Sequence, residues 1–275
     1  HLSLKSRNGF DLKELRSQLE ISPELMVYQN LYVKTQYTDL KANLTFTTHD
    51  FKSYKNFIND VLLSFDFRES VVDLADLSYF VPSMSDAHHQ ISLDGKVSGS
   101  VGNLRSDKFA LTLNEDSYVI GEFDIRGLPD IQETFIFFEA SRLKLNARAL
   151  KNLPTRSFNA KSDIKVPKAF ERFGEVFFEG NFTGYLNDFV AYGHFKTALG
   201  EFDTDISLSQ DANNYFYDGS LTAQQFDLGG LLQKQSFKDI SFNVDIDGQG
   251  VELENIEAKA IGEISSLTYN NYEYN

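Results

Sequence analysis

Apolar and polar residues alternate most regularly between residues 180 and 209, where the sequence predicts three short strands. Turn residues at Asn187-Asp188 and Gly200-Glu201 separate these strands. Because successive side chains of a strand point to opposite faces of a sheet, the last strand places its apolar residues on one face and its carboxylates on the other. Glycine inside a strand marks a bulge, a bend or a close approach to the backbone, and three glycines interrupt these strands: Gly180, Gly184 and Gly193.

The same alternation starts at residue 90 and returns near residue 240. Apolar residues and glycines occupy every second position from Ile91 to Val101, and serine, lysine and aspartate fill the positions between them. This period of two predicts the strands of an antiparallel sheet with one apolar face. The side chains that we expect on that face are Ile91, Leu93, Val97, Val101, Phe109, Leu111, Leu113, Phe182, Phe202, Ile206, Leu208, Ile240, Phe242, Val244 and Ile246.

Weaker patterns predict further short elements along the chain. Asp50 has the position of a helix N-cap before residues 51–59, and a second short helix is predicted for residues 73–80. A helical turn is predicted for residues 147–153, and the pattern assigns no element before residue 24. The remaining strands predicted in this way are residues 25–33, 40–47, 62–67, 119–125 and 134–138.

Two motifs recur at nearly the same distance along the chain. GKVSGSVGNL begins at Gly95, and GNFTGYLNDF begins 85 positions later, at Gly180. FEASRLKL begins at Phe138, and LTAQQFDL begins 83 positions later, at Leu221. Such similar offsets indicate an internal repeat of several strands and a short helical turn, which would stack into an elongated body. We therefore expect one continuous body with an N-terminal part at 1–89, a first clear repeat at 90–154 and a second at 155–275.

The charge balance argues against polyanionic partners. The chain has 26 lysines and arginines against 40 aspartates and glutamates, a formal net charge of −14. Nucleic acid and anionic membrane surfaces both require positive charge on the protein, so this balance opposes binding to either. Cysteine is absent, which excludes a disulfide framework and a thiolate metal site but fits a cytoplasmic or a periplasmic protein equally. The chain starts at His1 and its strand pattern runs to the end, so we expect a segment of a longer protein.

The motifs of the sequence favour no enzyme. The sequence contains no HExxH, GxSxG or GxxxxGK[ST] motif. His88-His89 lacks a partner at zinc-binding spacing, and the glycine-rich residues 95–102 lie inside an alternating strand rather than before a helix. We therefore expect no catalytic residue, no metal and no cofactor. Two aspartate pairs do not continue into a calcium loop and are interpreted as a solvated strand face: Asp203/Asp205 and Asp245/Asp247.

With both repeats in view, the chain resembles the TamB family (a component of the translocation and assembly module) within the AsmA-like superfamily, most of all its long Bacteroidetes-type members. The resemblance spans roughly residues 73–250. The order and spacing of five motifs carry it: DLADLSYFVP at 73–82, ISLDGKVSGSVGNL at 91–104, FDIRGLPDI at 123–131, GNFTGYLNDFVAYGHFKTALGEFDTDISL at 180–208 and FDLGGLL at 226–232.

This resemblance implies a long β-sheet folded into a taco-like trough with an apolar interior, the architecture of bridge-like lipid-transfer proteins. It also implies a middle segment, located in the periplasm. The parent protein would be anchored in the inner membrane by an N-terminal helix and would meet an Omp85-type partner at the outer membrane. Under this hypothesis the apolar face defined above would contact phospholipid acyl chains that move between the two membranes.

Two other functions stay open at this point. A scaffold for the assembly of outer-membrane β-barrels would use sheet edges for strand addition. A structural β-solenoid would need neither lipid nor barrel protein. The apolar face also has a second interpretation, the ordinary core of a β-sandwich. The trough is favoured because the repeat supplies no second sheet in sequence to cover that face, and a long uncovered apolar surface would otherwise promote aggregation.

Overall fold

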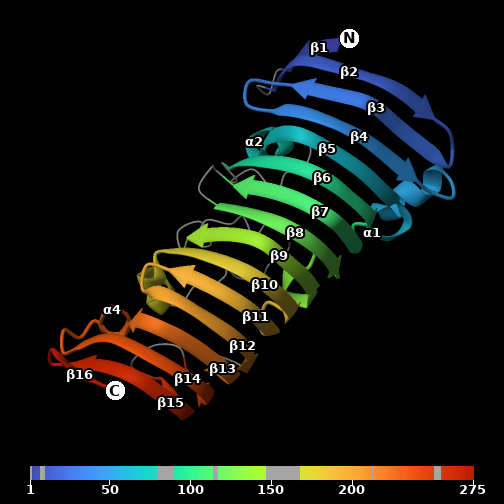
Figure 1. The fold of residues 1–275 in the computed structure, drawn as a ribbon. Helices are drawn as coiled ribbons and strands as arrows, with labels where there is room; N and C mark the ends of the chain where they lie inside the picture. The colour runs from blue at the N-terminus through green and yellow to red at the C-terminus, as the bar shows by residue number, and fades with distance from the viewer. Residues whose placement is uncertain are drawn as a thin grey trace. The chain divides into compact units, whose positions relative to one another are not determined.

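The computed structural model describes residues 2–6, 10–79, 89–113, 117–146, 168–211, 214–250 and 255–275. Sixteen strands in this part form an antiparallel sheet in which the strands follow one another in chain order, from β1 to β16 (Figure 1). The predicted fold class, an all-β antiparallel sheet with a few short helices, is confirmed. Chain order means that each strand pairs with the strand that precedes it, so hairpins make the sheet.

The strands vary from three to fourteen residues in length. Their bounds are β1 Leu2–Lys5, β2 Asp11–Ile21, β3 Leu25–Lys34, β4 Asp39–Thr47, β5 Leu62–Asp73, β6 Gln90–Ser100, β7 Asn103–Leu113, β8 Ser117–Arg126, β9 Phe135–Asn146, β10 Glu175–Tyr185, β11 Asp188–Thr197, β12 Gly200–Asp211, β13 Asn214–Asp227, β14 Phe237–Gln249, β15 Glu257–Tyr269 and β16 Tyr272–Tyr274. The helices are η1 Phe51–Asn56, α1 Phe57–Asp60, α2 Leu74–Leu77, η3 Ile131–Glu133, η5 Lys168–Phe173 and α4 Leu228–Leu232. Among these described helices, none has both the length and the apolar character needed to cross a membrane.

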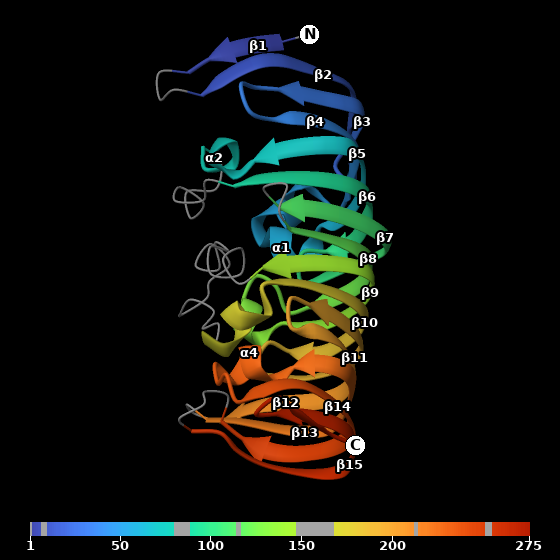
Figure 2. The same cartoon turned by 60° about the vertical axis from the view of Figure 1, so that its left-hand side comes forward.

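The chain divides into two compact units. Unit 1 comprises His1–Ile136 with Pro154–Asp163, and unit 2 comprises Phe137–Leu153 with Ile164–Asn275. Strands β1 to β8 therefore belong to unit 1 and β10 to β16 to unit 2. Within each unit the strands bend along their length (Figure 2). The ranges predicted from the repeats, 1–89, 90–154 and 155–275, stay a prediction.

Most predicted elements exist, with different bounds. The helix expected at 51–59 is η1 followed by α1, and Asp50 caps it by accepting hydrogen bonds from the backbone N–H groups of Lys52 and Ser53 at 2.8 and 3.0 Å. The helix expected at 73–80 is the single turn α2. Strands β5 and β9 extend well beyond the predicted 62–67 and 134–138, and the sequence pattern does not predict strands β1 and β2. The helical turn predicted at 147–153 lies outside the described residues.

Alternate strands from β3 to β7 of unit 1 carry a β-bulge. At the bulge, each of the strands β3, β5 and β7 has one residue more than the facing segment of either neighbouring strand. This extra residue falls within a pair of exposed polar residues. The pair lets the strand keep apolar residues on one face, because the bulge absorbs the break in the alternation. Strand β13 of unit 2 has the same feature against β14. The four pairs are Gln29-Asn30, Arg68-Glu69, Asp107-Lys108 and Gln224-Gln225.

Side chains of the neighbouring strand hold several bulges in place. The backbone N–H of Asn30 donates to Oδ1 of Asn43 at 2.8 Å. The equivalent N–H of Glu69 donates to Oδ2 of Asp94 at 3.0 Å, and that of Gln225 to Oγ of Ser241 at 3.0 Å. A bulge takes its backbone groups out of the regular ladder, so these side chains supply the acceptors that the ladder no longer provides.

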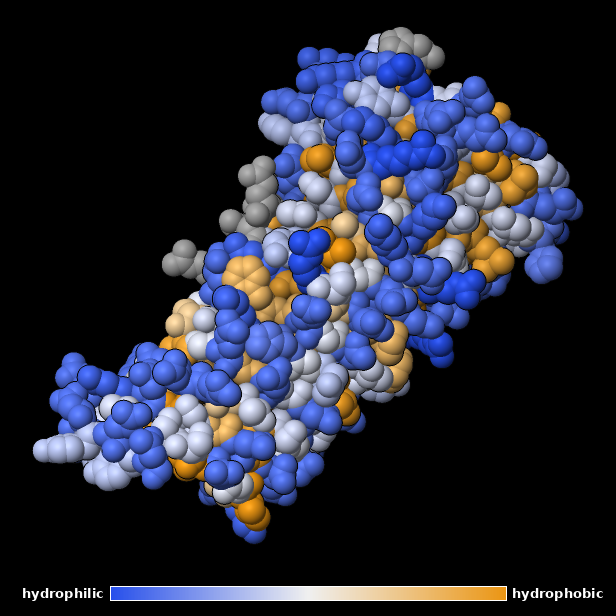
Figure 3. All heavy atoms as spheres, viewed as in Figure 1, coloured by the Kyte–Doolittle hydropathy of each residue, from blue (hydrophilic) through white to orange (hydrophobic). Residues whose placement is uncertain are grey.

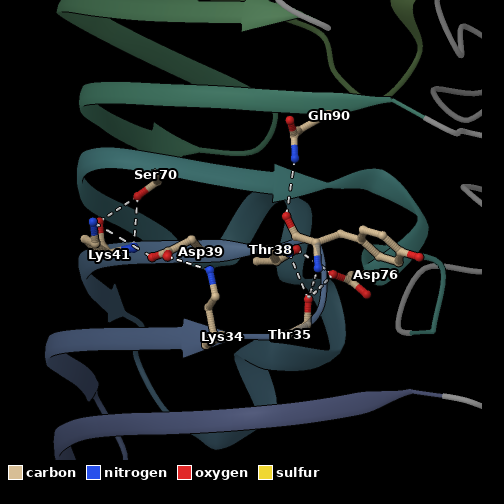
Figure 4. Close-up of polar contacts among 9 residues, drawn as sticks. Lys34, Thr35, Thr38, Asp39, Lys41, Ser70, Asp76 and Gln90 are labelled. Atoms are coloured by element: carbon tan, nitrogen blue, oxygen red, sulfur yellow. Dashed lines mark hydrogen bonds and ion pairs between the residues drawn. The ribbon is translucent and has the colours of Figure 1, made fainter.

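The turn between β3 and β4 is fixed to α2 by a buried polar cluster (Figure 4). Oδ2 of Asp76 accepts hydrogen bonds from the hydroxyls of Thr35 and Thr38, each at 2.6 Å. Thr35 Oγ1 accepts in turn from the backbone N–H of Thr38 at 2.9 Å, which closes the turn. Both threonines are buried, with 2% and 5% of their surface exposed, so Asp76 satisfies hydroxyls that water does not reach.

Replacing Asp76 by alanine should therefore destabilise unit 1. Hydrogen bonds to a charged group contribute about 1.5–3 kcal/mol each, and the variant also leaves two buried hydroxyls without an acceptor, so we expect a loss of about 3 kcal/mol. Urea unfolding followed by circular dichroism measures this change. The control is Asp124→Ala, which removes only the exposed ion pair with Arg126 and should cost under about 1 kcal/mol. Equal stability of the two variants would contradict the structural role of Asp76.

Candidate functional site

The pairing register of unit 2 aligns apolar residues into rows that cross strands β10 to β15. Each row takes one residue from each of the six strands, and the rows together define the unit 2 apolar face. Row A is Phe182, Ala191, Ile206, Gly219, Ile246 and Ala260; row B is Gly180, Gly193, Thr204, Leu221, Val244 and Gly262; row C is Phe178, Phe195, Phe202, Ala223, Phe242 and Ile264; row D is Gly184, Phe189, Leu208, Tyr217, Gly248 and Ala258.

Aromatic rings fill the space that the glycines leave on this face. A Cβ on Gly180 would lie 3.0 Å from Cζ of Phe178, and a Cβ on Gly193 would lie 2.8 Å from Cε2 of the same ring. Phe178 therefore lies across the Gly180–Gly193 pair. The ring row continues from Phe178 to Phe195 at a centroid distance of 4.6 Å and from Phe195 to Phe202 at 5.0 Å. Of the three roles that glycine in a strand predicts, close approach to the backbone is the one found here.

Two short helices cover one end of the unit 2 apolar face. Leu199, Ala223 and Phe226 form a buried cluster, and Phe173 of η5 and Leu231 of α4 pack against it. A hydrogen bond of 2.7 Å from the Arg172 guanidinium to the carbonyl of Leu231 joins the two helices. This end of the face is therefore a closed core with its own hydrogen-bonded cover.

The rest of the face is only half-buried. Phe182, Ile206, Leu208, Val244 and Ile246 are all partly accessible to solvent. Within the described residues all strands belong to one sheet, so no second sheet packs over these side chains. The apolar residues of this face are in register over six strands and form one continuous patch. The surface of a soluble protein normally carries apolar residues singly or in smaller patches.

Unit 1 has an apolar face of the same construction. Ile91 pairs with Leu113 and Leu93 with Leu111 across β6 and β7, while Phe109 lies opposite Gly95. The rings of Phe109 and Phe123 pack edge to face at 5.6 Å. Val97 lies in a row with Tyr28, Leu44 and Phe65 of the preceding strands.

The expected apolar residues are placed as follows. All lie in strands and share an apolar face within their unit, with one correction: Val101 lies in the turn between β6 and β7. Strand β6 ends at Ser100 because Val101-Gly102 makes the reversal into β7, so Val101 is not a strand position. Ile240 pairs with Phe226 beyond the β13 bulge and packs against the covered cluster rather than the open part.

Buried hydroxyls interrupt the apolar character at a few points. Tyr217 in row D has a buried hydroxyl with no hydrogen-bond partner among the described residues, and desolvation raises the pKa of this phenol. In unit 1 the hydroxyls of Ser106 and Ser117 are buried in the same way. The apolar faces therefore accept isolated polar atoms but no charged side chain in the rows defined here.

The opposite face is mainly polar, with a few exposed apolar side chains such as Val190, Tyr192 and Ile261. Asp203, Asp205, Asp245 and Asp247 are exposed there, as expected for a solvated strand face, and Figure 3 shows hydrophilic residues predominating over the strands on the side it presents. His194, which belongs to no recognisable sequence motif, pairs with Oδ1 of Asp203 at 2.9 Å. On the same face the Lys196 ammonium, 2.7 Å from Glu201, lowers the pKa of that carboxyl. In the described part of the chain no three His, Asp or Glu side chains come together as a metal site.

Comparison with known proteins identifies no relative of this chain. No protein-family model, no curated protein and no solved structure matches the chain. The half-buried apolar face of each unit is consequently the feature from which function has to be inferred.

Proposed function

We propose that this chain is a periplasmic segment of a TamB-like protein, and that its apolar faces shield phospholipid acyl chains during transport between the inner and outer membranes. The observation that supports the proposal is the set of apolar rows that cross the strands of unit 2 in register and stay half-exposed. The motif resemblance to the TamB family also supports this proposal. Contact with an Omp85-type protein would belong to parts of a parent protein outside this segment.

The physical task of such a surface is to replace water around an acyl chain. Each buried CH₂ group contributes about 0.8 kcal/mol, so one acyl chain exposed to water would cost on the order of 10 kcal/mol. Rows A, B and D present aliphatic side chains, aromatic rings and glycines in adjacent strands, so an acyl chain passing from strand to strand would keep apolar contact. Such passage requires no chemical step and no catalytic residue.

Two adjacent positions on opposite faces of strand β14 allow a test of this proposal. Val244 lies in row B of the apolar face, and Asp245 points to the polar face because the strand period is two. A photocrosslinking amino acid at position 244 should capture phospholipid in cells, and the same amino acid at position 245 should not. Native mass spectrometry of the purified segment should in addition show phospholipid bound to the unmodified protein.

The result also separates the alternatives. Lipid captured equally at both positions would indicate nonspecific adsorption and would contradict the proposal. Capture of β-barrel proteins in place of lipid would favour the assembly scaffold, and capture of neither would favour a structural β-solenoid.

A further inference from the structure

The polar face of unit 1 contains a hollow at the β3 bulge where cations from three different strands meet. The hollow has a volume of about 730 Å³ and is open to solvent. Arg16 of β2, Lys41 of β4 and Arg68 of β5 line it, and no carboxylate is among its lining residues. The chain as a whole has a formal net charge of −14, so the cations that line this hollow contrast with its total charge.

The sheet register brings two of these cations into one row. Arg16 pairs with Tyr32, and Tyr32 pairs with Lys41, so the three side chains lie on the same face of adjacent strands. The guanidinium carbon of Arg16 lies 4.9 Å from the centre of the Tyr32 ring, which fixes the arginine over an aromatic face. Arg68 belongs to the polar pair of the β5 bulge and reaches the hollow from there.

Each cation has an acidic neighbour that is not among the lining residues of the hollow. Arg16 contacts Glu14 through Nε at 2.6 Å, and Arg68 contacts Asp66 through Nη2 at 3.3 Å. A guanidinium carries five N–H donors, so each arginine has donors beyond the nitrogen used in this contact. Lys41 is 3.9 Å from Asp39, a carboxylate that binds Lys34 more closely at 2.7 Å.

Neutral polar residues line the hollow as well, together with Leu31 and Ala42. Asn43 accepts the bulge N–H of Asn30 through Oδ1, which leaves its Nδ2 group able to donate to a ligand. Gln18 and Ser17 of β2 also line the hollow, and the Ser17 hydroxyl donates to the carbonyl of Gln29 at 3.1 Å. The hollow therefore offers guanidinium, ammonium and amide donors together, which is a donor set that binds oxyanions.

We propose that this hollow binds an oxyanion of the phosphate class. The two arginines supply planar pairs of N–H donors, and Lys41 supplies a compact ammonium charge. Phosphate oxygens accept hydrogen bonds from all three side chains. The net negative charge of the chain opposes broad anionic surfaces, whereas a single phosphate needs only this local group of cations. The source is either a free or solute-borne phosphate or the headgroup of an anionic lipid. This site is on the polar face, so it does not depend on lipid binding by the apolar face.

A titration of the ¹⁵N-labelled chain with inorganic phosphate tests the site at constant ionic strength. Backbone amide signals of the β3 bulge and of β4 beside Lys41 should shift and saturate. In the triple variant Arg16→Gln, Lys41→Gln, Arg68→Gln, the affinity should fall at least about tenfold, the loss of roughly one charged hydrogen bond. The matched control, Arg105→Gln, Lys196→Gln, Lys238→Gln, changes the net charge equally and should bind as the unmodified chain does.

The second arm identifies the source of the phosphate. Sedimentation with vesicles of phosphatidylglycerol and of phosphatidylcholine would show binding to the former only, lost in the hollow variant, if a lipid headgroup is the ligand. Phosphate binding without vesicle binding would assign the site to a free or solute-borne phosphate. Absence of saturable shifts, or an equal loss in both triple variants while both keep their circular dichroism spectra, would overturn the proposal.

Discussion

Replacing Gly219 by valine is expected to unfold the sheet of unit 2. Gly219 lies in row A with a φ of +148°, and a Cβ there would be 2.1 Å from the carbonyl oxygen of Asp205 and 2.7 Å from the Cα of Ile206. Both atoms belong to the backbone of β12, so no side-chain rotation relieves the overlap. Separating the paired strands would break ladder hydrogen bonds, and we expect a loss of about 3–5 kcal/mol, enough to unfold many domains.

Thermal unfolding monitored by circular dichroism measures this loss. The control is Ser220→Val at the next position, where the side chain points to the polar face and valine suits a strand, so the change should stay within about 0.5 kcal/mol. A Gly219→Val variant that melts with the unmodified protein would show that β12 and β13 are not paired in this register.

The faces of the sheet could be predicted from the sequence where alternation is unbroken. In β12, Phe202, Ile206 and Leu208 alternate with carboxylates and serines without interruption, and the structure places the two sets on opposite faces. A period of two fixes the face of every residue once the strand is recognised, so the expected apolar residues could be named without knowing which strands pair.

The bulges and the first strands could not be predicted by the same reasoning. At the β5 bulge, Arg68 and Glu69 stand between Phe67 and Ser70 and break the period of two, so the alternation alone ends the strand at residue 67. A pair of adjacent exposed polar residues between two less exposed positions is the signal that would extend it. In β2 the pattern from Asp11 to Ile21 is rich in charges and does not alternate, and its pairing with β3 decides its structure instead.

The oxyanion hollow could not be predicted because it depends on register. Arg16, Lys41 and Arg68 are about 25 residues apart in sequence, a separation that carries no motif. Only the pairing of β2 with β3, β3 with β4 and β4 with β5 brings them to one place. The total charge of the chain argues against anion binding in general. A sum over all residues, however, does not show where a few cations lie close together.

A Val244→Glu variant is expected to keep its fold and lose its lipid. Val244 is half-buried in row B, and its neighbour across β15 is Gly262, which has no side chain to confine a longer group. A glutamate there can extend toward water, so its carboxylate avoids the cost of several kcal/mol that an unpaired buried charge would carry. The same carboxylate interrupts the apolar row, and an acyl chain could pass it only by desolvating a charge.

Circular dichroism and native mass spectrometry of this variant separate an open apolar face from a packed core. An open face predicts a melting curve close to that of the unmodified chain together with loss of bound phospholipid. The matched control is Asp245→Glu, which keeps the charge on the polar face and should retain both fold and lipid. In a packed core the same Val244→Glu change would bury the carboxylate and unfold unit 2. Unfolding of this variant, combined with no lipid crosslink at position 244, would indicate that the apolar face is an ordinary packed core.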